Sequence, residues 1–293
     1  MPNGPLSEVF GFPADNLSAK AERFRRNRLC PHNNIVANCT KDKASDPLGV
    51  CSIFDKAGGI AITCPVRFRQ DWLIAEHAAA FFFPANSQWT SLTEVRIRDK
   101  HGQPAGNIDL VLAAYDDQGN ILDFGALEVQ AVYISGNVRR FFDRYQQNPS
   151  DYLKAAPGNV HNWPRPDYLS SSRKRLVPQL LYKGGILKSW GKRQAIALSR
   201  RFFETLPALV EVDSTEADIV WLIYDLTLDE QLNEYQLSLE QRVYTHFEHA
   251  LGQIMRPEVG EIDDFLADLQ EKLDQKLEND LNAPEAPTLV DLL

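Results

Sequence analysis

The stretch N-I-D-L-V-L-A-A-Y-D-D-Q-G-N-I-L-D-F-G-A-L-E-V-Q, from Asn107 to Gln130, decides the fold of this chain. It predicts two apolar strands, residues 108–115 and residues 121–129, joined by a turn at residues 116–120. Asp, Gly and Asn in that turn are typical of a β-hairpin. We therefore expect the rest of the chain to be organised around a hairpin.

Each strand of this hairpin carries one acid inside an apolar run, Asp109 in the first and Glu128 in the second. A carboxylate in such a run is costly to bury unless it is paired or binds a metal. Gln130 follows two residues after Glu128 and therefore lies on the same face of its strand. Two carboxylates and an amide suit Mg²⁺ and a positioned water. Acids on a solvated strand face, or the acid pair of a glycosidase, fit the same pattern.

All four cysteines lie within 35 residues, with the spacing C-x8-C-x11-C-x12-C. The segment between them is rich in turns and short of large apolar residues, so we expect that it does not form a core of its own. A tetrahedral thiolate site would supply the missing stability. Four thiolates suit zinc and iron equally well. The expected ligands are Cys30, Cys39, Cys51 and Cys64.

Charge is distributed very unevenly along the chain, whose formal net charge is −9. Residues 258–293 contain eleven acids and two bases, so this segment alone accounts for −9. Residues 136–203 contain fourteen Lys and Arg against three acids, which gives +11. Such a basic region predicts a polyanionic partner.

Apolar patterns predict the remaining elements. Helices are expected at residues 67–83, 175–190, 202–209, 237–255 and 261–281, and strands at residues 91–98, 194–198 and 217–226. A long irregular stretch at residues 146–174 has aromatic and basic residues that favour a functional loop. With neither a leader sequence nor an apolar run of membrane length, the protein is expected to be cytoplasmic.

Taken together, these motifs resemble a known family. The hairpin with Asp109 and E-x-Q at residues 128–130 looks like the PD-(D/E)xK nuclease fold. The pattern C-P…C…G-V-C…C-P, followed by E-x14-D and F-G-A-L-E-V-Q, resembles the NotI family of type II restriction endonucleases. In that family a Gln replaces the usual catalytic Lys, and the cysteines hold an iron.

The resemblance implies a role for each matching residue. Asp109 and Glu128 match the acids that bind the catalytic Mg²⁺, Gln130 matches the third motif position, and Glu94 matches an upstream acid. The implied fold is α/β, a PD-(D/E)xK nuclease core with a mixed central sheet flanked by helices and an N-terminal four-cysteine metal-binding subdomain. We expect a four-cysteine metal-binding region at residues 1–75, a catalytic domain at 76–257 and an acidic C-terminal helix and tail at 258–293.

The sequence thus predicts a type II restriction endonuclease that hydrolyses double-stranded DNA with Mg²⁺. Cutting both strands in one encounter needs two copies of the site, so a homodimer acting on a palindromic sequence is expected. The alternative is a protein that holds a metal on its four cysteines and binds DNA without cutting it. Acids placed beside phosphate disfavour this alternative, because they would only repel DNA.

Overall fold

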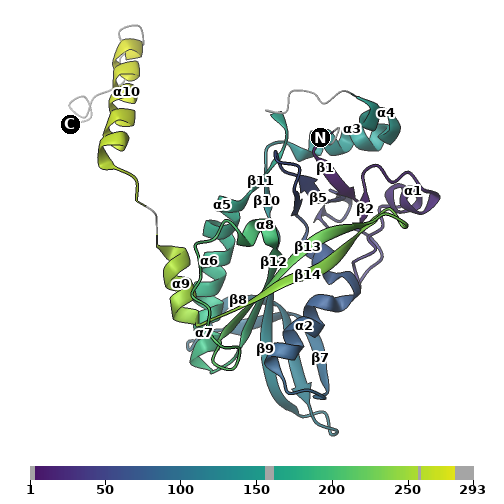
Figure 1. Ribbon diagram of the computed structural model, residues 1–293, viewed down its shortest axis with the longest axis vertical. Helices are drawn as coiled ribbons and strands as arrows, with labels where there is room; N and C mark the ends of the chain where they lie inside the picture. The colour runs from purple at the N-terminus through teal and green to yellow at the C-terminus, as the bar shows by residue number, and fades with distance from the viewer. Residues whose placement is uncertain (1–3, 156–161, 257–258, 281–293) are drawn as a thin grey trace. The chain divides into compact units, whose positions relative to one another are not determined.

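The computed structural model describes residues 4–155, 162–256 and 259–280 (Figure 1). The chain divides into two compact units, Met1–Met255 and Arg256–Leu293. In the second unit the described structure is one helix, α10 (Ile262–Asp280), close to the predicted one. Within the described residues no helix is both long and apolar enough to cross a membrane.

The first unit is built on a six-stranded sheet with the order β14-β13-β12-β9-β8-β7. Strands β9, β12 and β13 are parallel to one another, and the other neighbours are antiparallel. The predicted hairpin and the mixed central sheet are therefore confirmed. The strands are β7 (Trp89–Arg98), β8 (Pro104–Tyr115), β9 (Ile121–Gln130), β12 (Gln194–Ser199), β13 (Ile219–Asp229) and β14 (Glu234–Thr245).

Helices cover both faces of this sheet (Figure 1). Helix α2 (Leu73–Phe82) packs on one face, against alternate residues of the strands such as Leu127 and Val129. A broken helix packs with α9 (Phe247–Met255) on the other face, against Ile196, Leu198 and Trp221. The segments of the broken helix are α5 (Tyr168–Ser171), η3 (Ser172–Leu176), α6 (Val177–Gln179), η4 (Leu180–Gly184) and α7 (Gly185–Ser189), of which η3 and η4 are π-helical.

A smaller sheet with the order β2-β1-β5-β6 lies beside helices from later in the chain. Its apolar side chains share one core cluster with Phe142, Tyr145 and Tyr152 of α3 and α4. The cysteine-bearing segment therefore packs into a core that it shares with later helices, not into one of its own, as expected. Besides η1, which is described below, the other elements of the first unit are β1 (Leu6–Val9), β2 (Phe12–Pro13), α1 (Ala19–Arg26), β3 (Asp42–Lys43), β4 (Asp46–Pro47), β5 (Val50–Phe54), β6 (Ile60–Ile62), β10 (Tyr133–Ser135), α3 (Val138–Gln147), α4 (Pro149–Lys154), β11 (Arg165–Asp167) and α8 (Arg200–Phe203).

The prediction of a helix at residues 237–255 was wrong for its first half. Residues up to Thr245 form β14, which pairs with β13, and only the second half is helical. The extra residue Glu240 interrupts the register, because Ile223 pairs with Gln241 and Tyr224 with Leu239. A bulge of this kind shifts the in-out alternation by one residue. Leu239 and Val243, four residues apart on either side of the bulge, pack on opposite faces of the sheet, and their spacing imitates a helix.

Two further predictions need correction. The helix expected from residue 67 begins at Leu73, because Asp71 and Trp72 have positive φ and separate it from the turn η1 (Pro65–Trp72). The stretch at residues 146–174 is less irregular than expected, since it contains α4, β11 and α5. Residues 156–161 of that stretch lie outside the described residues.

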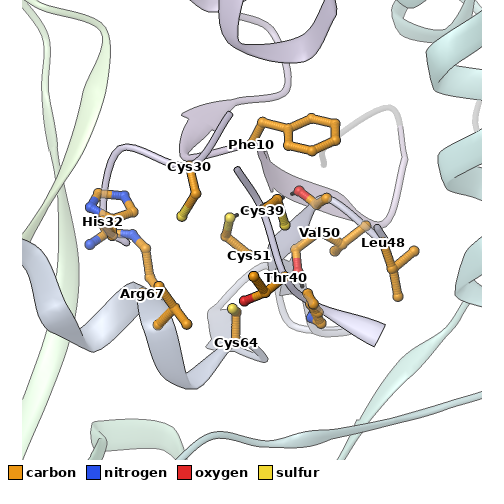
Figure 2. Close-up of a pocket in the computed structure, with 13 residues that line it drawn as sticks. Phe10, Cys30, His32, Cys39, Thr40, Leu48, Val50, Cys51, Cys64 and Arg67 are labelled. Atoms are coloured by element: carbon orange, nitrogen blue, oxygen red, sulfur yellow. Dashed lines mark hydrogen bonds between the residues drawn. The ribbon is translucent and has the colours of Figure 1, made fainter. Parts of the chain in front are cut away.

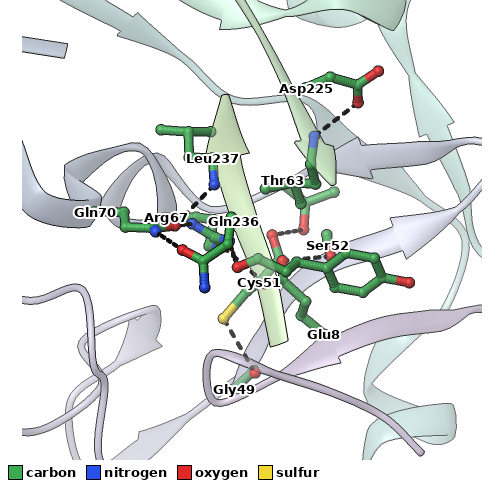
Figure 3. Close-up of polar contacts among 12 residues, drawn as sticks. Glu8, Gly49, Cys51, Ser52, Thr63, Arg67, Gln70, Asp225, Gln236 and Leu237 are labelled. Carbon is green, nitrogen blue, oxygen red and sulfur yellow. Dashed lines mark hydrogen bonds and ion pairs between the residues drawn. The ribbon is translucent and has the colours of Figure 1, made fainter. Parts of the chain in front are cut away.

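A buried ion pair joins the two sheets (Figure 3). Arg67 Nε lies 2.8 Å from Glu8 Oε1, and both side chains are fully buried. The remaining guanidinium nitrogens donate to Gln70 Oε1 and to the carbonyl of Tyr235 on β14, each at 2.8 Å. Glu8 also accepts a hydrogen bond from Ser52. Arg67 therefore ties β1 of the small sheet to the edge strand of the central sheet.

We expect the variant Arg67→Met to lower the free energy of unfolding by about 3–5 kcal/mol, because it leaves the Glu8 carboxylate buried without its partner. Chemical denaturation followed by circular dichroism measures this change. The matched control is Arg69→Met, which removes an arginine of the same turn that forms no ion pair among the described residues. A cost below about 1 kcal/mol, the value of a surface ion pair, would contradict the assignment.

Candidate active site

The candidate site lies where the two strands of the hairpin stop pairing. The β8–β9 ladder ends at the pair Leu110 and Leu127. Asp109 and Glu128 are the next residues on the two strands, so they face each other just beyond the end of the ladder. The backbone N–H of Val129 donates to Asp109 Oδ2 at 2.9 Å instead of to a β8 carbonyl. The structure therefore brings the two predicted acids together where the sheet opens.

Glu128 is almost fully buried on the face opposite α2, because its neighbours Leu127 and Val129 point toward that helix. Its Oε2 lies 2.7 Å from Nζ of Lys183, which is also buried. Burial and the nearby Asp109 carboxylate raise the pKa of Glu128 to about 8, although the Lys183 ammonium opposes this shift. A divalent cation would stabilise the charged form of this carboxylate, because it offsets both the burial and the repulsion from Asp109.

Gln130 lies on the same side of β9 as Glu128 and is also buried. Its Nε2 donates to Oε1 of Gln179. Two acceptor atoms in this group, Glu128 Oε1 and Gln130 Oε1, are buried and make no hydrogen bond within the described residues. Buried polar atoms without partners are uncommon, and a missing ion or water is a frequent reason. These two oxygens are therefore available to an ion or a water at the site.

Glu94 lies on β7 at the level of Asp109, because Thr93 pairs with Leu110 and Val95 with Ile108. Its side chain is exposed, and its backbone has a φ of 53°. A non-glycine residue with positive φ is uncommon and occurs often at functional sites. Glu94 is thus adjacent to the acid pair along the sheet, but it forms no ion pair or hydrogen bond with it in the described part of the chain.

The basic region at residues 136–203 is partly neutralised by acids from outside it. Ion pairs with such acids are formed by Arg139, Lys183, Lys188, Lys192, Arg200 and Arg201. The exposed Arg165, Arg173 and Lys174 form no ion pair among the described residues. Arg165 is on β11, which pairs with β10, the strand that follows Gln130. The bases available to a polyanion are therefore fewer than the sequence indicates.

All four cysteines line one pocket (Figure 2). Its free volume is about 10 Å³, which is the size of a single water or ion. The figure shows their side chains pointing into this space, with His32 and Arg67 at its edge. None of the four forms a disulfide. Four separate parts of one 35-residue stretch, including strand β5 and the start of η1, therefore bring the predicted thiols together.

Burial favours the neutral form of these thiols. Burial raises the pKa of Cys30 to about 12, and it raises the pKa of Cys39 and Cys51 as well, with the neighbouring Cys64 adding to each shift. In the described residues, however, no three His, Cys, Asp or Glu side chains stand in a metal-holding arrangement. Four thiols thus share the pocket, but in the described structure they are not arranged as metal ligands.

A comparison with protein families identifies the class. The family model described as Restriction endonuclease NotI matches residues 15–237 of the chain, which include all four cysteines and the whole of the hairpin. The chain is therefore a restriction endonuclease, an enzyme that cuts DNA. It belongs to the NotI family. No curated protein matches the chain.

Two residues of the site were missed from the sequence, Lys183 and Gln179. Both lie on the broken helix, about fifty residues after their partners on β9. No spacing rule connects a helix residue to a strand so far away. The sequence indicated only that both residues lie in the basic region at residues 136–203.

Proposed function

We propose that the protein is a type II restriction endonuclease with a PD-(D/E)xK core, which hydrolyses double-stranded DNA at a specific palindromic site with Mg²⁺. The observation that carries this proposal is the pair of facing acids, Asp109 and Glu128, at the open end of the hairpin, with one Glu128 oxygen free. A mixed sheet flanked by helices is consistent with such a core.

Asp109 and Glu128 would hold the Mg²⁺. When bound, the ion lowers the pKa of a coordinated water and adds positive charge beside the scissile phosphate. The free Oε1 of Gln130 is suited to accept a hydrogen bond from the attacking water, and the contact with Gln179 fixes the orientation of this amide. The exposed bases Arg165, Arg173 and Lys174 are suited to contact DNA phosphates.

Incubation of the purified protein with plasmid and phage DNA in Mg²⁺ tests this function. We expect discrete fragments whose ends map to one short symmetric sequence, and none in EDTA. A smear of random ends would contradict site specificity. Intact DNA over a wide range of sequences, from protein that binds it tightly, would favour the non-cleaving alternative.

We further propose that Cys30, Cys39, Cys51 and Cys64 hold one iron or zinc ion with a structural role. The support is the shared pocket and the all-thiol donor set. A site closed by four protein ligands leaves no open position for substrate, so this ion would not take part in cleavage.

The enzyme is proposed to act as a homodimer, and α10 offers a surface for it. This helix exposes an apolar stripe formed by Ile262, Leu266, Leu269, Leu273 and Leu277. We expect Leu269→Arg to lower the apparent mass from dimer to monomer in light scattering at about 5 µM. Charge on an apolar helix seam disrupts pairing, which is the reason for this expectation.

The matched control is Gln275→Arg, which adds the same charge on the opposite side of α10. It should leave the mass unchanged. If the unmodified protein is a monomer with and without DNA and still cuts both strands, the dimer is wrong. A dimer that survives Leu269→Arg would place the contact elsewhere on the chain.

A further inference from the structure

We infer that Lys183 is a catalytic residue, which supplies from helix η4 the positive charge that Gln130 cannot supply from strand β9. This inference rests on the proposed function. It assigns the lysine role of a PD-(D/E)xK site to a residue outside the E-x-Q motif.

The first support is the position of the ammonium group. Lys183 Nζ lies 2.7 Å from Glu128 Oε2 and 2.8 Å from the backbone carbonyl of Asn107, and the residue is only 4% exposed. An ammonium has three N–H donors. These two contacts leave one donor, since the described residues offer no third acceptor. A phosphate oxygen or a water bound beside Glu128 would be within reach of it.

The second support is the way in which the lysine reaches the site. Its side chain passes over Gly106 of β8, where an added Cβ would lie 3.4 Å from Lys183 Cδ. Gly106 has a φ of 117°, which other residues rarely adopt. Where the lysine crosses it, the strand therefore has no side chain and has a backbone conformation that favours glycine.

The third support is the match between helix and strand. Gln179 and Lys183, four residues apart, contact Gln130 and Glu128, two residues apart on the facing strand. The helix departs from regular geometry here, because Gln179 ends α6 and Lys183 lies on the π-helical segment η4. π-helical turns are rare and occur often at functional sites. The irregular helix thus presents two side chains to two site residues at once.

The fourth support is charge. Metal binding requires charged carboxylates, and Asp109, Glu128 and Lys183 then leave a net charge of −1 for a divalent cation. Burial of an ion pair is a poor way to gain stability, because the desolvation cost offsets the attraction. A buried lysine on a carboxylate with a free oxygen is therefore better explained by chemistry than by anchoring.

Three variants test the inference in plasmid cleavage at saturating Mg²⁺. Lys183→Met should cut about 10²-fold more slowly, the loss expected when one donor to developing charge is removed. Lys183→Gln, which keeps polar contacts, should be equally slow. The double variant Lys183→Met with Gln130→Lys should recover at least about tenfold, because it returns the charge to the strand. The control is Lys188→Met. Lys188 lies on the same broken helix and forms an ion pair with Asp218, and its variant should cut normally.

A second measurement does not depend on cleavage. Mn²⁺ binding without DNA, followed by calorimetry, should be as tight or tighter in Lys183→Met, because a positive charge near the ion is removed. A purely structural anchor predicts weaker Mn²⁺ binding and no recovery in the double variant, and that pair of results would overturn the inference. Asp109→Ala distinguishes failure of the Lys183 inference from failure of the proposed function. If Asp109→Ala is inactive while both Lys183 variants cut normally, only the inference fails. If Asp109→Ala itself cuts normally, the proposed function fails.

Discussion

Replacement of Asp109 by alanine should abolish DNA cleavage and leave DNA binding intact. Asp109 accepts a hydrogen bond from Val129 and faces Glu128 where the hairpin opens, so its loss removes one of two carboxylates available to the metal. We expect at least about 10³-fold slower cutting, equivalent to about 4 kcal/mol of transition-state stabilisation. Binding should be unchanged or slightly tighter, because one negative charge near phosphate is gone.

The control for this variant is Asp117→Ala, in the exposed turn of the same hairpin. It removes the same charge from the same supersecondary unit and should cut at the rate of the unmodified protein. Single-turnover cleavage and gel-shift binding in Ca²⁺ measure the two quantities separately. An Asp109→Ala protein that cuts normally would show that the catalytic metal is held elsewhere.

Loss of one cysteine should remove the bound metal and destabilise the folded protein. Cys51 is buried in the pocket lined by all four cysteines. We expect Cys51→Ser to lower the bound iron or zinc from about one equivalent to near zero, since a four-thiolate site loses one of its ligands. Metal binding stabilises the folded state, so the free energy of unfolding should fall by about 3 kcal/mol or more.

Thr40→Ala is the matched control, because Thr40 lines the same pocket and has no thiol. Elemental analysis and thermal unfolding of the two variants give the comparison. Unmodified protein that contains no iron or zinc, and is as stable as Cys51→Ser, would contradict a structural metal.

The sequence was informative about the site wherever local rules apply. The alternation of side chains in β9 places Glu128 and Gln130 on one face, and antiparallel pairing across a short turn brings Asp109 opposite Glu128. These relations depend on neighbours in the chain, so they could be predicted. The four cysteines line one pocket, although no three of the described His, Cys, Asp or Glu side chains form a metal-holding group.

Other features depend on contacts between distant segments, and no local pattern encodes them. Lys183 meets Glu128 only because the broken helix packs on the sheet. The core into which the cysteine segment packs includes Phe142 and Tyr145. Phe142 lies about eighty residues after the last cysteine, Cys64. The half of the predicted helix that is β14 was missed because the bulge at Glu240 changes the period of the pattern.

Anomalous diffraction from crystals of the protein soaked with Mn²⁺ tests the central claim most directly. Mn²⁺ prefers the same oxygen ligands as Mg²⁺ and gives a signal that locates it. We expect a manganese peak held by Asp109 and Glu128, with the ion on the side of the free Glu128 Oε1. A manganese peak bound by other residues, with Asp109 and Glu128 contacting only protein, would contradict it.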